Sequence, residues 1–110
     1  MPHIIIEHDE KTKNEIDLSK LAKSLHLNLA SQDTIKLEAI KTRTVELKNV
    51  IVGTGASNRM IHIEVLLLEG RSQELKEYIA QELFNLTQIM LQELECALTV
   101  NIAELGVYKK

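Results

Sequence analysis

The spacing of apolar residues changes several times along this 110-residue chain, and these changes limit the folds that it can adopt. β-branched residues dominate residues 2–7, which predicts a short strand. Residues 18–30 show helical spacing, through Leu18, Leu21, Ala22, Leu25 and Leu29. Residues 38–47 then alternate as a second strand does, with Lys41 and Arg43 on the same face. The first half therefore predicts a strand, a helix and a strand.

The second half follows the same order. Turn-forming residues at 53–58 fall near the midpoint, and residues 60–68 alternate as a third strand. Ser72 is expected to cap a long helix that runs to about residue 95, with Glu74 in its first turn. A last strand is predicted over residues 97–105.

This order predicts an α+β fold, in which two βαβ units form one four-stranded sheet with two helices on one face. Crossover helices are right-handed almost without exception, so both helices should cover the same face. We expect a single domain over residues 1–110, with pseudo-repeat halves at about 1–57 and 58–110. The opposite face would carry His62, Glu64 and some apolar side chains, and we expect a symmetric oligomer to cover it.

Composition excludes several functions. The net charge is −3 and no basic stripe with interleaved aromatics is present, which argues against nucleic acid as a partner. No apolar run approaches the roughly 20 residues of a membrane span and no signal peptide opens the chain, so we expect no membrane and a cytoplasmic protein. Cys96 is the only cysteine, which excludes an internal disulfide or a thiolate metal cluster and favours simple packing.

Two further polar groups have simple interpretations. His62 and Glu64, with His3 and Glu7 nearby, are of a type that binds zinc, but polar residues on such a face are more commonly hydrogen-bonded to each other. We therefore expect no metal. The polar run at residues 9–15 is interpreted as a solvated loop.

Pro2 is the most distinctive candidate for chemistry. Excision of Met1, which a small second residue favours, would leave Pro2 with a free secondary amine held in a fixed direction by its ring. Such an amine titrates near neutrality and can act as a base, the more so beside cations. The alternative is structural, because proline is also tolerated at the start of a strand.

The segment at residues 67–77, with Gly70, Arg71 and Ser72, resembles the strand-to-helix junction of the tautomerase superfamily. The opening residues 1–7, residues 39–43 and the strand of His62 are similar to the longer-chain 5-carboxymethyl-2-hydroxymuconate delta-isomerase family. The resemblance covers nearly the whole chain and preserves its two halves.

This resemblance implies that Pro2 is the catalytic base and that Arg71 binds the substrate. It aligns two family arginines with Lys41 and Arg43. Lys41 departs from the pattern, because a lysine lacks the planar fork that grips a carboxylate, and Arg43 could take over this role. Each of these cations has a simpler reading: Arg71 as a solvated loop residue, and Lys41 and Arg43 as ordinary charges on an exposed strand.

The expected function is that of a cofactor-independent keto-enol tautomerase or isomerase of unsaturated di- or tricarboxylic acids. The resemblance implies a homotrimer and aromatic-acid catabolism, with 5-carboxymethyl-2-hydroxymuconate as the first substrate to test. Two alternatives remain open. One is a proline-based hydratase or dehalogenase, and the other is a non-catalytic trimeric binding module of the same fold.

Overall fold

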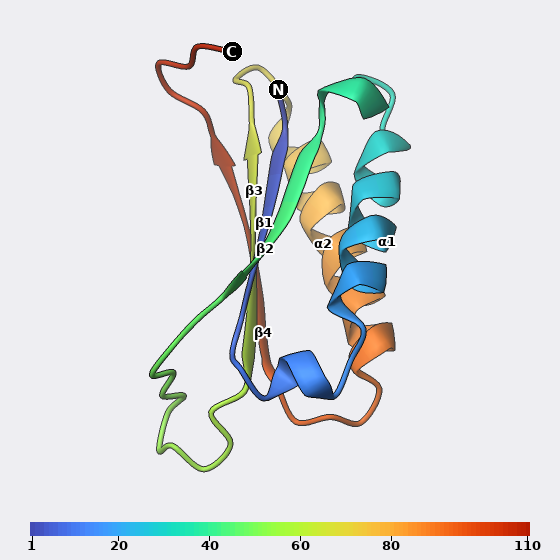
Figure 1. Ribbon diagram of the computed structural model, residues 1–110. Coiled ribbons are helices and arrows are strands. Elements are labelled where there is room, and N and C mark those ends of the chain that lie inside the picture. The colour runs from blue at the N-terminus through green and yellow to red at the C-terminus, as the bar shows by residue number, and fades with distance from the viewer.

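The computed structural model describes residues 1–110 as a four-stranded sheet with both helices packed against one face (Figure 1). The elements are β1 (His3–His8), η1 (Thr12–Asn14), α1 (Leu18–Ala30), η2 (Leu37–Ala39), β2 (Lys41–Glu46), β3 (Met60–Leu67), α2 (Gln73–Leu91) and β4 (Ala97–Glu104), where η denotes a short 3₁₀ helix. The predicted order of strands and helices is confirmed. Strand β2 begins three residues later than the alternation suggested, because residues 37–39 form η2.

The sheet has the strand order β2-β1-β3-β4. β1 pairs with β2 in parallel and β3 pairs with β4 in parallel, whereas the central pair β1 and β3 is antiparallel. Each βαβ unit thus contributes two neighbouring parallel strands, joined by a helix that crosses the sheet. The predicted α+β fold, with both helices on one face, is confirmed.

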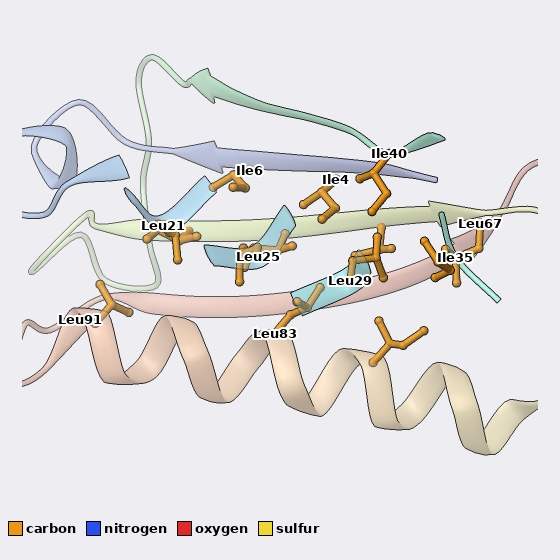
Figure 2. Close-up of a cluster of buried hydrophobic side chains, with 14 residues drawn as sticks. Ile4, Ile6, Leu21, Leu25, Leu29, Ile35, Ile40, Leu67, Leu83 and Leu91 are labelled. Atoms are coloured by element: carbon orange, nitrogen blue, oxygen red, sulfur yellow. The ribbon is translucent and has the colours of Figure 1, made fainter. Parts of the chain in front are cut away.

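The core lies between the helices and the sheet (Figure 2). One face of β1 and of β3 and one stripe of each helix are buried, as the predicted alternation implies. β2 and β4 contain no buried residue. Fully buried members are Ile4 and Ile6 of β1, Ile61, Ile63, Val65 and Leu67 of β3, Leu21, Leu25 and Leu29 of α1, and Ile79 and Leu83 of α2. Burial of each such side chain contributes about 1.5–3 kcal/mol, which makes this layer the main source of stability.

Side-chain caps define where the helices begin. Asp17 accepts a hydrogen bond from the backbone N–H of Lys20, and Ser72 accepts one from Leu75, which confirms the predicted cap at Ser72. Helix α2 ends at Leu91 and not at residue 95. The backbone of Gln92 has a φ of 54°, which a helix cannot continue, and the chain turns there toward β4.

The expectation of a solvated loop at residues 9–15 is wrong for two of its residues. Asp9 is only 3% exposed and Thr12 is fully buried. The Asp9 carboxylate accepts hydrogen bonds from the hydroxyl and the backbone N–H of Thr12 and from the backbone N–H of Met60, at 2.8 Å for each N–H. Asp9 therefore joins the start of η1 to the start of β3, and its charge is compensated in the interior.

No helix is both long enough and apolar enough to span a membrane.

Candidate active site

The candidate residues meet at one end of the sheet. β1 and β2 start there, while β3 and β4, which run the opposite way, end there. His3 is paired with Lys41 on one side and with Leu66 on the other. Figure 1 shows the two chain ends and the turn from β3 to α2 at this same end of the sheet. Pro2, Lys41 and Arg71 are brought together there from three segments that are distant in the sequence.

Pro2 is buried, and its carbonyl oxygen accepts a hydrogen bond of 3.0 Å from the backbone N–H of Lys41. This bond fixes the start of β1 against β2. The pKa of the amino-terminal amine, which Met1 carries, is lowered by partial burial and then by the positive charges of Lys110, Arg71 and Lys41. An amine at this position is therefore biased toward its neutral, proton-accepting form.

Arg71 lies in the turn after β3, where Gly70 takes up a φ of 110° that other residues rarely adopt. Its guanidinium donates hydrogen bonds to the carbonyl oxygens of Leu68 (3.4 Å) and Thr34 (3.2 Å). Its Nε–H is buried and has no partner. The backbone thus holds the guanidinium in a fixed orientation, and its buried Nε–H is among the donors that remain unused.

Arg43 lies on the uncovered face of β2 and contacts β1. Its Nη1 donates to Nδ1 of His3 at 3.1 Å. On the other side of the same ring, Nε2 of His3 is 2.8 Å from the hydroxyl oxygen of Tyr108. The pKa of His3 is lowered by burial and by the neighbouring positive charges of Arg43, Lys41 and the terminal amine. Arg43 therefore belongs to the same group of positive charges as Lys41, and the His3 ring lies beside them.

Four further polar residues of the uncovered face are hydrogen-bonded to one another, among them His62 and Glu64 as predicted. His62 contacts Glu64 through Nε2 at 2.8 Å and the hydroxyl of Thr99 through Nδ1 at 2.6 Å. The second oxygen of Glu64 accepts a hydrogen bond from the side-chain amide of Asn101 at 2.8 Å. The structure contains no group of three or more His, Cys, Asp or Glu residues arranged to hold a metal ion.

Sequence reasoning considered His3 only as a possible metal ligand, and it did not identify Tyr108 and Lys110. Tyr108 and Lys110 follow the last strand and belong to no periodic pattern, so no local signal marked them. Their role depends on the return of the chain to the start of β1. None of the five hollows in the surface is lined by Pro2, Lys41, Arg43 or Arg71, so in the single chain the cluster is open.

The sheet of two βαβ units with both helices on one face is a fold that this chain shares with solved members of the tautomerase superfamily. The family model for 5-carboxymethyl-2-hydroxymuconate isomerase matches residues 2–108. The chain belongs to this family. Family membership supports an isomerase of the tautomerase superfamily, and it confirms the resemblance inferred from the sequence.

Solved structures share the fold at low sequence identity. A 5-carboxymethyl-2-hydroxymuconate isomerase from Deinococcus radiodurans R1 superimposes with a TM-score of 0.86 at 20% identity, over 99% of this chain and 88% of that one. A fused 4-OT described as a symmetric trimer gives 0.71 at 17% identity, over 96% and 90%. A macrophage migration inhibitory factor-like protein from Entamoeba histolytica gives 0.65 at 16%, over 96% and 89%. No curated protein sequence matches the chain.

Proposed function

We propose that this protein is a cofactor-independent isomerase that moves a proton within an unsaturated di- or tricarboxylic acid, with Pro2 as its base once Met1 has been removed. The main support is that Lys110, Arg71 and Lys41 lie near enough to the amino terminus to lower the pKa of the Met1 amine, one residue before Pro2. The same three charges that lower the proton affinity of the amine are suited to bind the carboxylates of an anionic substrate.

The proposed reaction is the conversion of a dienol to an unsaturated ketone. Pro2 takes the proton from the enol oxygen, and the electron pair spreads through the conjugated system. The protonated amine then delivers the proton to a distant carbon of the same molecule. Arg71 and Lys41 hold the carboxylates, and the free donors of the Arg43 guanidinium are available to a further carboxylate on the same side. This proton transfer requires no metal and no organic cofactor.

We propose 5-carboxymethyl-2-hydroxymuconate as the substrate to test first, in the catabolism of aromatic acids. The name of the matching family and a solved relative support this choice. We also propose a homotrimer, since two of the structural neighbours are described as symmetric trimers and the sheet has one uncovered face. In such an assembly a second copy would close the open cluster.

A second candidate is a non-catalytic trimeric binding module. The observation that favours it is Lys41, which stands where the family resemblance expects an arginine and which cannot grip a carboxylate through two parallel hydrogen bonds. A proline-based hydratase or dehalogenase would need a further group to activate water, and no residue of the cluster is suited to this task as clearly as Pro2 is to proton transfer.

The test measures the ultraviolet absorbance of 5-carboxymethyl-2-hydroxymuconate and 2-hydroxymuconate during turnover. Protein whose mass shows the loss of Met1 is compared with protein that retains Met1. In the retained form the Pro2 nitrogen is an amide and cannot accept a proton, so this form is the matched control. We expect activity only in the processed form.

A second comparison uses processed Pro2→Ala. This variant keeps an amino-terminal amine but loses the ring that orients it, and we expect kcat to fall about 10²-fold, at the lower end of the usual contribution of a general base. Circular dichroism checks that the fold is retained. Equal activity with and without Met1 would refute the role of Pro2, and absence of turnover by the processed wild type would favour the binding module.

A further inference from the structure

The segment after β4 returns to the start of β1, and its Tyr108 contacts the residue next to Pro2. The hydroxyl oxygen of Tyr108 lies 2.8 Å from Nε2 of His3. The two rings also meet edge to face, with centroids 5.7 Å apart and an interplanar angle of 82°. This pair joins residues that are 105 positions apart, and it places a half-buried phenol at the candidate active site.

Arg43 determines which ring nitrogen of His3 carries the proton. A guanidinium has only donors and keeps its charge, so Nδ1 of His3 must accept the hydrogen bond from Arg43. In the neutral imidazole the proton is then on Nε2, which donates to the oxygen of Tyr108. The lowered pKa of His3, caused by burial and the nearby cations, agrees with this neutral form.

This arrangement leaves the hydroxyl proton of Tyr108 free. The oxygen of Tyr108 accepts from His3, so its own O–H must donate in another direction, and the structure contains no partner for it. The phenol of Tyr108 is an uncharged hydrogen-bond donor. It differs in this respect from the cations around it, which suit carboxylates.

The free hydroxyl belongs to a side chain that contacts the residue following Pro2. His3 follows Pro2 directly in the chain, and the terminal amine and Lys41 are among the positive charges that act on the His3 ring. Lys41 also acts on the amine itself. Two kinds of hydrogen-bond donor therefore lie at this end of the sheet, namely several charged groups and one neutral hydroxyl.

We propose that the Tyr108 hydroxyl donates a hydrogen bond to the 2-oxygen of the substrate, with His3 and Arg43 as positioning residues that orient it. The inference rests on the proposed function and assigns one residue to the recognition of the substrate's 2-oxygen. Pro2 removes the proton from that oxygen and delivers it to carbon, while Tyr108 keeps its own proton throughout. The negative charge that develops on the 2-oxygen strengthens the hydrogen bond in the transition state.

The kinetic test is Tyr108→Phe in processed protein, with Tyr78→Phe as the matched control. Tyr108→Phe keeps the ring that packs against His3. Tyr78 is the only other tyrosine, and it is exposed on α2. We expect Tyr108→Phe to lower kcat about 10- to 100-fold with KM nearly unchanged, and Tyr78→Phe to leave both unchanged. A purely structural role for Tyr108 would instead raise KM and lower the thermal midpoint.

A binding measurement tests the inference independently of turnover. Calorimetry compares 2-oxoadipate with adipate, two stable acids that differ by the 2-oxygen. Wild type should bind 2-oxoadipate about 3- to 10-fold more tightly, and Tyr108→Phe should lose this preference while its affinity for adipate stays the same. The inference is overturned if the preference is absent, if it survives in Tyr108→Phe, or if neither acid binds. Failure of the proposed isomerase appears separately, as absence of turnover.

Discussion

The buried carboxylate of Asp9 allows a prediction whose size follows from the structure. Asp9→Asn replaces one accepting oxygen by an NH₂ group. This NH₂ group must face one of the donors that bind the carboxylate in the wild type. The donors are the hydroxyl and N–H of Thr12 and the N–H of Met60. A hydrogen bond to a charged group contributes about 1.5–3 kcal/mol, so the loss of one such bond should lower the free energy of unfolding by about 2–3 kcal/mol.

The assay is urea denaturation at pH 7, with Thr12→Val as a matched control. That variant removes one donor and keeps the side-chain shape, and it should cost less, about 1–2 kcal/mol. A domain of this size has a total stability of about 5–15 kcal/mol, so both changes are measurable. An effect of Asp9→Asn below about 0.5 kcal/mol would refute the reasoning.

The same substitution also predicts a pH dependence. Burial alone would raise the pKa of Asp9, but the hydrogen bonds from Thr12 and Met60 outweigh it and lower the pKa below its usual value. A lowered pKa stabilises the fold above the unfolded value of about 3.9, and this contribution is lost as the pH falls through the folded pKa. The difference between wild type and Asp9→Asn should therefore be full above about pH 5 and shrink on acidification. A difference that does not shrink as the pH falls below the unfolded value would contradict this account.

Two further predictions concern the site and the core. Lys41→Met removes one positive charge beside the terminal amine, so the pKa of that amine should rise. The amine must be neutral to act as a base, so the rise of kcat/KM with pH should move to higher pH, and KM should increase about 10- to 100-fold from the lost contact with a carboxylate. An unchanged pH profile would show that Lys41 is not close to the base. Leu83→Ala should lower the free energy of unfolding by about 2–5 kcal/mol, because Leu83 is fully buried on α2. Ile89→Ala, on the same helix at 70% exposure, should change it by less than about 0.5 kcal/mol, and similar losses in the two variants would contradict the packing described.

Local patterns in the sequence were sufficient for the elements that bury one face. In β3 and α1, the spacing of a few neighbouring apolar residues indicates which side chains face the core. Both elements were therefore predicted. The cap at Ser72 has the same local origin. The end of α2 was less predictable, because apolar residues such as Leu94 continue the pattern beyond the last helical residue.

The interior role of Asp9 could not be predicted from its neighbours. Charged and polar residues surround it in the sequence, which is typical of a solvated loop. Its burial depends on the N–H of Met60, 51 residues further along the chain, and on the turn that brings Thr12 back to it. Only the packed chain supplies these donors.

The candidate site divides in the same way. The sequence by itself determined Pro2 at the start of a strand, Lys41 and Arg43 on one strand face, and Arg71 at a turn before a capped helix, because each depends on local chemistry and period. The tertiary structure alone decided that these residues lie at one end of the sheet, and that Tyr108 contacts His3 there. The physical reason is that hydrogen bonds and charges act through space, and distances between segments that are far apart in the chain are set only when the sheet pairs and the core packs.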